Sequence, residues 1–587
     1  MRISGNKARF GRVVAALMIL LMVLALPGCK EIIYVTGNAA PIDWSGYLDL
    51  TKEIERELDP ARRELLMHRA EDMLMDTGAV APIYYVRDCF LLRPEVQNLA
   101  ANVTGVKYFA KASYPGQDVL KASFGPEPDS IDPALTWTFE GTSIASSLFE
   151  GLLVSDERGN HIPALANDLP AVSPDGATYT FVLREGLSWS DGRPLTGWDF
   201  VYAWNRAVAL DEESFLNVIA KNEDGSLDLA VSEDGRVLTV FLGGPCAYFS
   251  DLCSMPMTMP LRQDIVEGAP HIENPDFDDP GVWATEAGFP VCGPYKLTSW
   301  VHDSNMVLEK NEYYHGAAGV IIPRIELMIT ADTGNMLAAY NAGSLDFCSE
   351  IPPEVYPVLR GMADFKSADI IGVSYAMFNV ESRMFDYRSV EDARDIRMAL
   401  RLLIDRQRIV DSCVQSEGAV ANTFVPESMN GAEGILFKRD IPGEDGYQYP
   451  YHGEDGGVGF FPTEYSEDAV AEAIYLLERA GFQFEEKNGR QKLSKKTPLS
   501  FEFLINDSTA NVDIAECIQQ DFSEIGINMS IRKCSWPTFM KEVMDGHYDM
   551  ARSVWIADFN DPVNMLDIFS KKNPSQLGER LAEQLED

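Results

Sequence analysis

Strand-like and helix-like segments alternate along most of this chain. Residues 179–184 (YTFVLR) alternate in the way of a half-buried strand, and Thr196 stands where it can cap the helix that follows. Further on, residues 514–525 form the pattern of an amphipathic helix, which precedes a strand-like run at residues 527–531. This alternation predicts α/β layers. A chain of 587 residues is too long for one core, so we expect two or three domains.

The N-terminal 29 residues predict an export signal. Four basic residues precede an apolar run at residues 13–26, which is short for a membrane span. The run ends in Leu-Pro-Gly-Cys, which resembles the bacterial lipobox, and this resemblance implies that Cys29 is lipidated and becomes the mature N-terminus. An ordinary secretory signal and an uncleaved anchor are the alternatives. We therefore expect a body that is held outside the cytoplasm by a lipid anchor on the cell membrane.

Charge and cysteine content exclude several kinds of ligand. The formal net charge of −41 argues against nucleic acid or an anionic membrane surface. Besides Cys29 there are eight cysteines, without C-x-x-C or paired zinc spacing, so no metal site is expected. Exported chains can form disulfides, but the sequence fixes no pairing. Cys246 and Cys253 are the closest pair along the chain, and free thiols are the alternative.

Catalytic motifs give no support for an enzyme. None of the seven histidines stands in H-E-x-x-H, and the chain has neither a G-x-S-x-G elbow nor a P-loop. Residues 456–459 (GGVG) are too weak a pattern for a phosphate loop, and residues 437–462 around them are expected to form a flexible surface loop. We therefore expect neither an enzyme nor a cofactor.

An aromatic and acidic segment near the C-terminal end is the strongest candidate site. A β-prone run at residues 550–554 leads into it, and Asn-Asp-Pro at residues 560–562 ends it with a turn signal. Between them, Asp558 stands close to Trp555 and Phe559. A carboxylate held against aromatic rings suits an ammonium group. A core tryptophan beside a turn-capping aspartate is the plainer alternative.

Residues 555–562 (WIADFNDP) resemble the W-x-A-D-[YF]-x-[DE]-P segment of the family 5 extracellular solute-binding proteins, the peptide-binding components of ABC transporters. A longer stretch, residues 183–206 (LREGLSWSDGRPLTGWDFVYAWNR), is also similar to this family. The resemblance extends over residues 42–570. It implies a two-lobed, periplasmic-binding-protein-like α/β fold of type II, in the large class with an extra subdomain on lobe I.

The order of the resembling segments is unusual. Residues 42–85 resemble the closing segment of the family, and the usual opening begins only near Val119. This order resembles a circular permutation, which a fold tolerates where the old termini lie close and the new cut falls in an exposed loop. A wrongly assembled gene with a non-functional product is the alternative. A genuine permutation would place residues 42–83 against residues 370–570 and attach a Cys29 anchor to lobe II.

The permuted order implies the following division of the chain. The expected segments are the signal peptide (1–29), a tether (30–41), part of lobe II (42–83), lobe I (84–165 and 290–366), its extra subdomain (166–289), the rest of lobe II (367–570) and a tail (571–587).

The resemblance also implies roles for single residues. In the family, the aspartate of this segment pairs with the α-amino group of the bound peptide, and Asp558 holds that place. Arg552 is expected to meet the ligand carboxylate or to balance Asp558, with a structural ion pair as the alternative. Residues 375–379 and 552–558 are the candidate strand edges for main-chain bonds to a peptide. The candidate ligand-binding residues are Asp558, Trp555, Arg552, Phe559, Tyr375, Phe378, Asn379 and Trp536, the last with a plain core position as its alternative.

The function that this resemblance implies is capture of oligopeptides between the lobes and delivery to the permease subunits of an ABC transporter. The expected state is a monomer held at the membrane by its lipid. A binder of nickel, haem or sugar on the same fold is the nearest rival, because fold does not fix the ligand. A peptide-sensing lipoprotein and an extracellular peptidase are the others.

Overall fold

The computed structural model describes residues 42–211, 214–268, 280–415, 418–454 and 456–569. The predicted signal peptide, the tether and the tail, and with them Cys29, lie outside these ranges. Within the ranges, no helix combines the length and the apolar character that crossing a bilayer requires.

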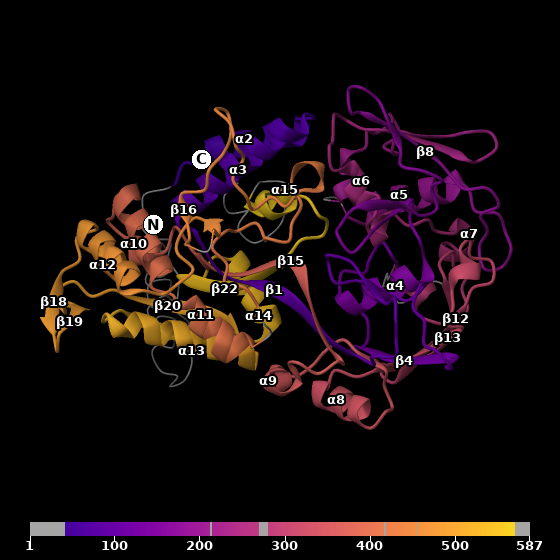
Figure 1. Cartoon of the computed structure of the whole chain (residues 1–587). Helices are drawn as coiled ribbons and strands as arrows, with labels where there is room; N and C mark the ends of the chain where they lie inside the picture. The colour runs from indigo at the N-terminus through magenta and orange to yellow at the C-terminus, as the bar shows by residue number, and fades with distance from the viewer. Residues whose placement is uncertain (1–41, 212–213, 269–279, 416–417, 455, 570–587) are drawn as a thin grey trace, which may run out of the picture.

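A ten-stranded mixed sheet runs through the molecule and connects two lobes (Figure 1). Its longest strands, β1 and β15, are central neighbours and pair antiparallel over most of their length. We call the side from β11 to β14 lobe I and the side from β22 to β21 lobe II; β1 and β15 run through both. The order is β11 (Tyr295–Val301), β12 (Asn305–Lys310), β13 (Arg324–Ile329), β4 (Val119–Gly125), β14 (Phe347–Cys348), β1 (Val80–Leu92), β15 (Phe365–Phe378), β22 (Met550–Ile556), β20 (Ser500–Asn506) and β21 (Asn528–Cys534).

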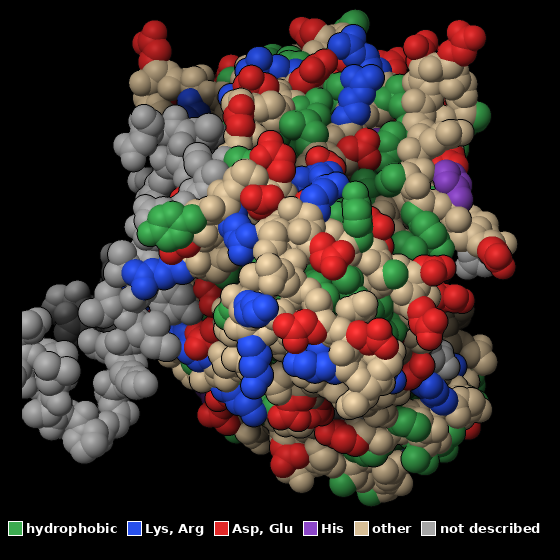
Figure 2. All heavy atoms as spheres, turned by 90° about the vertical axis from the view of Figure 1, so that its left-hand side faces the viewer, with side chains coloured by type: hydrophobic (Ala, Val, Ile, Leu, Met, Phe, Trp, Pro, Cys, Tyr) green, Lys and Arg blue, Asp and Glu red, His purple; other side chains and the backbone are tan. Residues whose placement is uncertain are grey.

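Amphipathic helices pack on both faces of the lobe II strands. The predicted helix at residues 514–525 and the strand at residues 527–531 are confirmed as α13 and β21. The end of this lobe shows acidic and basic side chains interspersed over its surface (Figure 2). Its main helices are α10 (Val390–Leu402), α12 (Glu467–Arg479), α13 (Thr509–Glu524) and α14 (Trp536–Met544).

Lobe I carries a second, four-stranded sheet, in the order β7, β8, β10, β9. The strand predicted at residues 179–184 is confirmed as β8, and the cap predicted at Thr196 is confirmed as a capping box with Asp199 at the start of α5. The bounds are β7 (Ala171–Val172), β8 (Thr178–Val182), β9 (Leu229–Val231), β10 (Val237–Phe241), α4 (Phe139–Leu148) and α5 (Gly197–Leu210).

Shorter elements complete the two lobes. They include β2 (Ala100–Ala101), β3 (Lys107–Tyr108), β5 (Leu153–Ser155), β6 (His161–Pro163), β16 (Tyr451–His452), β17 (Val458–Gly459), β18 (Phe484–Lys487), β19 (Arg490–Leu493), α6 (Phe249–Leu252), α7 (Gln263–Val266), α8 (Thr333–Asn341), α9 (Tyr356–Leu359), α11 (Arg406–Ile409) and α15 (Pro562–Leu566).

The first described helices pack against lobe II. They are α2 (Ser45–Arg56) and α3 (Pro60–Thr77); Asp59 caps α3, and Gly78 ends it with a φ of 67°. The Tyr47 hydroxyl donates to the carbonyl of Leu566 over 2.7 Å, and buried Arg406 donates to the carbonyl of Pro82 over 2.7 Å. Residues from the two ends of the described chain therefore share one core.

The structure corrects the expectation of a flexible surface loop at residues 437–462. Phe437 and Tyr449 in this stretch are buried. The His68 ring of α3 stacks between Phe437 and Tyr447, with ring centroids 4.0 and 4.1 Å away. The prediction was wrong for these residues because their aromatic rings find a partner on α3, far away in the sequence.

Candidate functional site

A cavity of about 530 Å³ lies between the lobes. Lobe I lines it with residues between 102 and 108 and with residues 133–139; Phe215 and residues 254–257 add to this side. Lobe II contributes residues 556–560, the loop that follows β22. The volume falls in the range that suits a small organic ligand or a short peptide.

The loop after β22 presents Asp558 to this cavity. The Asp558 amide donates to Oδ1 of buried Asn564 over 3.0 Å, and Nδ2 of Asn564 donates back to the Asp558 carboxylate over 3.2 Å. The cap of α15 is Asp561, whose carboxylate accepts from the Val563 amide. Asp558 therefore does not cap this helix, and its side chain is exposed to the cavity.

The carboxylate of Asp558 has no basic side chain as a partner among the described residues. Within the described ranges no Lys, Arg or His forms an ion pair with it. The protein walls around it raise the pKa of its carboxyl above the ordinary range, and the bond from Asn564 opposes this rise. A bound cation would stabilise the ionised carboxylate and so offset the cost of holding this charge between the protein walls.

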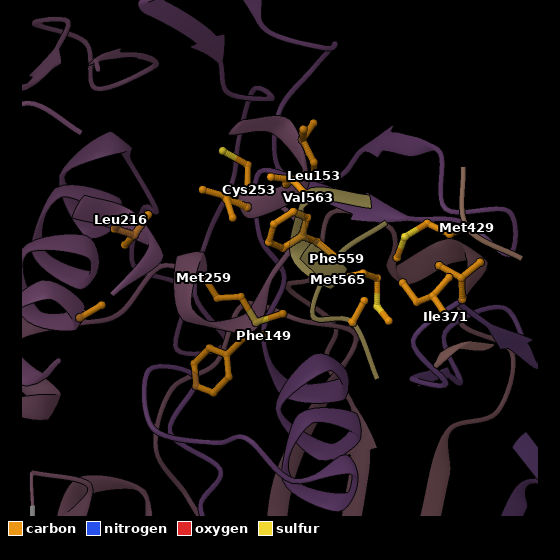
Figure 3. Close-up of a cluster of buried hydrophobic side chains, with 14 of the residues drawn as sticks. Phe149, Leu153, Leu216, Cys253, Met259, Ile371, Met429, Phe559, Val563 and Met565 are labelled. Atoms are coloured by element: carbon orange, nitrogen blue, oxygen red, sulfur yellow. The ribbon is translucent and has the colours of Figure 1, made fainter. Parts of the chain in front are cut away.

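Phe559 joins the two lobes. Its ring stacks on Tyr248 with centroids 5.4 Å apart and meets Phe215 edge-on at 5.8 Å. Figure 3 shows Phe559 beside Val563 and Met565, in one cluster with lobe I residues such as Leu153. Asn430 adds a polar contact across the same boundary, because its Nδ2 donates to the Arg158 carbonyl over 2.8 Å. The lobes are thus in contact beside the cavity, which Phe559 and Phe215 also line.

Only one of the two predicted strand edges is open. Residues 375–378 of β15 pair with β22 on one side, and β15 pairs with β1 on the other, so this strand offers no free edge. On β22, the pairing with β20 within the described chain is limited to Met550 and Ala551. The edge of residues 552–556 that faces away from β15 is therefore available for main-chain hydrogen bonds.

Arg552 lies away from Asp558. Its guanidinium donates to the Tyr84 hydroxyl over 2.9 Å, to the Ser374 hydroxyl over 3.0 Å, and to Asn511 Oδ1. These partners are uncharged, so the ion pair given as the alternative for this residue is not what holds it. The arginine fixes α13 and β1 to the strand that leads into the cavity.

The other candidates lie outside the cavity lining. Trp555 is half-buried, and Tyr375 packs edge-on against Phe424. Phe378 belongs to the lobe II core, and Asn379 donates to two backbone carbonyls of a turn at residues 546–548. Trp536 is 51% exposed, which excludes the core position, and it stacks on Phe539.

Sequence reasoning missed the lobe I side of the site. Trp137 lines the cavity with a side chain that is 79% exposed, and its amide donates to the Asp129 carboxylate over 3.0 Å. The same carboxylate accepts from the hydroxyls of Thr136 and Thr138, which holds the loop. The sequence signal for Trp137 was its position four residues after the Asp-Pro pair at residues 132–133.

A cavity between two lobes that share one α/β sheet is the architecture typical of periplasmic-type binding proteins. Residues 160–576 match the family described as "Bacterial extracellular solute-binding proteins, family 5 Middle". The chain belongs to this family, and the predicted fold class is confirmed.

Named relatives agree with this assignment. The oligopeptide-binding protein OppA of Bacillus subtilis is 28% identical over 488 residues, which cover 80% of this chain and 81% of OppA. The periplasmic oligopeptide-binding protein OppA of Salmonella typhimurium is 27% identical, over 77% of each chain. Among solved structures, the unliganded open form of the murein tripeptide-binding protein MppA has a TM-score of 0.58 at 22% identity, covering 80% of this chain and 85% of MppA.

Proposed function

We propose that the protein captures oligopeptides in the cavity between its lobes and delivers them to the permease subunits of an ABC transporter. Asp558 carries the proposal: its carboxylate faces the cavity, has no basic partner among the described residues, and directly follows a strand with an open edge. The names of relatives support the ligand class, because OppA of Bacillus subtilis is an oligopeptide-binding protein and OppA of Listeria monocytogenes has been solved bound to peptide.

The proposed peptide lies along β22. Its main chain forms hydrogen bonds with the open edge of residues 552–556, and its α-ammonium group reaches Asp558. An opposite charge at this place lowers the raised pKa of the carboxyl, so each group stabilises the ionised form of the other. Trp137 offers a flat apolar surface to the peptide side chains. Main-chain bonds do not depend on side-chain identity, so many sequences would bind.

The proposal includes an extracytoplasmic location and no chemical step. Relatives of this chain are named periplasmic. We propose export by residues 1–29, lipid attachment at Cys29 and action as a monomer at the outer side of the cell membrane. These residues lie outside the described ranges, so this part rests on the sequence and on the relatives.

We also propose that the chain is a genuine circular permutant. Residues 42–83 would then be part of lobe II, and the extra subdomain would span residues 166–289. The shared core supports this proposal, because Tyr47 is bonded to Leu566 and Arg406 to Pro82. A genuine permutation requires contacts of this kind between residues 42–83 and the later part of the chain. A Cys29 anchor would in this arrangement attach to lobe II.

Mass spectrometry of the small molecules that co-purify with the full chain tests the ligand class. We expect short peptides with free N-termini that are released on denaturation, and far fewer from the Asp558→Asn variant prepared in parallel. Asp168→Asn is a suitable control, because Asp168 is exposed and does not line the cavity. A metal ion, haem or sugar in place of peptides, or peptides that shorten during incubation with the protein, would contradict the proposal.

A further inference from the structure

Two cysteines that are far apart in the sequence meet in lobe II. Cys413 lies in the π-helical turn Val410–Val414, and Cys517 lies in α13. Their sulfur atoms are 3.4 Å apart, and both residues are partly exposed. Among the described residues this is the one sulfur–sulfur contact within hydrogen-bond range. Cys246 and Cys253, the closest pair along the sequence, are buried and free.

The backbone segments that carry the two thiols are fixed to each other by other bonds. Arg408 of α11, just before the π-helical turn, donates to the carbonyl of Cys517 over 2.7 Å and also to the Asp521 carboxylate. The Asp405 amide donates to the same carboxylate over 3.0 Å. The thiols are therefore held close by contacts that do not involve sulfur. A disulfide has an S–S length of about 2.05 Å, so bond formation requires an approach of little more than about 1 Å.

We infer that Cys413 and Cys517 form a modification site that takes a disulfide as its co-reactant, either a low-molecular-weight disulfide or the disulfide of a thiol oxidoreductase. One cysteine, as its thiolate, attacks a sulfur of the reagent, and a mixed disulfide forms while the first reagent thiolate leaves. The second cysteine, as its thiolate, attacks the protein sulfur of the mixed disulfide and releases the second reagent thiol. The two cysteines are oxidised to one disulfide, the reagent is reduced to two thiols, and the two cysteine protons end on the released thiols.

The protonation state and exposure of the two thiols determine how fast they form a disulfide. Burial, the hydrogen bond with Cys517 and the proximity of that thiol raise the pKa of Cys413 to about 12. The thiolate is the reactive form, so disulfide formation becomes faster as the pH rises. Most of the other cysteines within the described chain are buried, so a reagent reaches them less easily than it reaches this pair.

The cross-link would join positions that are 104 residues apart and enclose the aromatic stretch that covers α3. A closed loop of this length removes many conformations from the unfolded chain, which stabilises the folded state. Neither cysteine lines the cavity between the lobes. We therefore expect the disulfide to change stability and not peptide affinity, and the inference stands apart from the proposed function.

Oxidised glutathione is the probe for this inference. The reduced full-length protein is incubated with it at about pH 8.5 under native conditions, alkylated and digested with trypsin. We expect the peptide of residues 409–438, which contains Cys413, to be joined to that of residues 497–532, which contains Cys517. The oxidised protein should melt about 5–10 °C above the reduced protein.

Serine variants provide the controls. Cys413→Ser and Cys517→Ser should each abolish both the linked peptides and the shift in Tm. Cys534→Ser should retain both, because Cys534 is also partly exposed but has its sulfur directed at the Ile505 carbonyl. Recovery of the two peptides singly alkylated, recovery only as glutathione adducts, or a link between other cysteines would overturn the inference.

Discussion

At the scale of single residues, His68 is tightly packed although its polar ring nitrogens form no hydrogen bonds within the described chain. Its ring lies between two aromatic rings, and both ring nitrogens are buried without a hydrogen-bond partner among the described residues. Burial, followed by the nearby Arg439, lowers the pKa of His68 from 6.5 to about 3. The unfolded chain therefore takes up the proton more readily than the folded one. Stability from this residue is complete above about pH 6.5 and is lost as the pH falls towards about 3, by about 1.4 kcal/mol per pH unit.

The substitution His68→Phe tests this linkage. Phenylalanine keeps both stacks and leaves no buried nitrogen unpaired, so we expect equal or greater stability at pH 7, by up to about 2 kcal/mol. The loss of stability between pH 6.5 and 4 should become shallower, as measured by urea unfolding at a series of pH values. An identical slope for wild type and His68→Phe would contradict this account.

At the scale of elements, an ion pair fixes the loop of the site to α3. Arg63 is bonded to both carboxylate oxygens of Asp561, over 2.6 and 3.0 Å, and its guanidinium lies 5.8 Å from the Tyr248 ring centroid. Arg63 is buried, so removal of one partner leaves the other charge stranded. We expect Arg63→Gln to cost about 3–5 kcal/mol in the free energy of unfolding.

Neighbouring Arg62 offers the matched control. It pairs with Glu53 and Glu57 at an exposed position, so Arg62→Gln should cost less than about 1 kcal/mol. In a double-mutant cycle, Arg63→Gln combined with Asp561→Asn should destabilise by less than the sum of the two single changes. Additive effects in urea unfolding would mean that the pair does not hold the loop.

Elements with local signals could be predicted from the sequence, and elements that depend on distant partners could not. Asp59 and Pro60 predict the start of α3, and the cap at Thr196 predicts the start of α5, because each signal lies within one helical turn. The packing of Phe437 on His68 depends on a contact over hundreds of residues, and no periodicity reports it. Likewise, the segment around Asp558 was recognisable, whereas Trp137 belongs to the other lobe and enters the site only through the fold.

At the scale of the whole molecule, Phe559 couples the site to the contact between the lobes. The Phe559 ring contacts the rings of Tyr248 and Phe215, which lie on the lobe I side. Opening of the lobes must therefore separate Phe559 from these two rings. We expect Phe559→Ala to favour the open form of the unliganded protein, since an aromatic pair contributes about 0.5–1.5 kcal/mol beyond its buried area. Small-angle X-ray scattering should show a larger radius of gyration, and peptide affinity should fall.

A conservative change at the partner ring separates the aromatic contact from other effects. Tyr248→Phe keeps the stacked ring and should leave the scattering curve of the unliganded protein as it is. If Phe559→Ala and wild type give the same radius of gyration, the stack does not hold the lobes together.

The central claim for the whole molecule is that Asp558 receives the α-ammonium group of a peptide. Loss of one partner from a desolvated charge pair costs about 2–5 kcal/mol, so Asp558→Asn should weaken binding by tens- to thousands-fold. Asparagine keeps the shape of the side chain and can still bond to Asn564, so the fold should be retained.

Calorimetric titration of the unmutated protein with one peptide, first with a free and then with an acetylated N-terminus, tests this claim most directly. We expect the free peptide to bind and the acetylated peptide to bind tens- to thousands-fold more weakly, because acetylation removes the charge that Asp558 would meet. Equal affinities for the two peptides would contradict the assignment of Asp558 as the amine site.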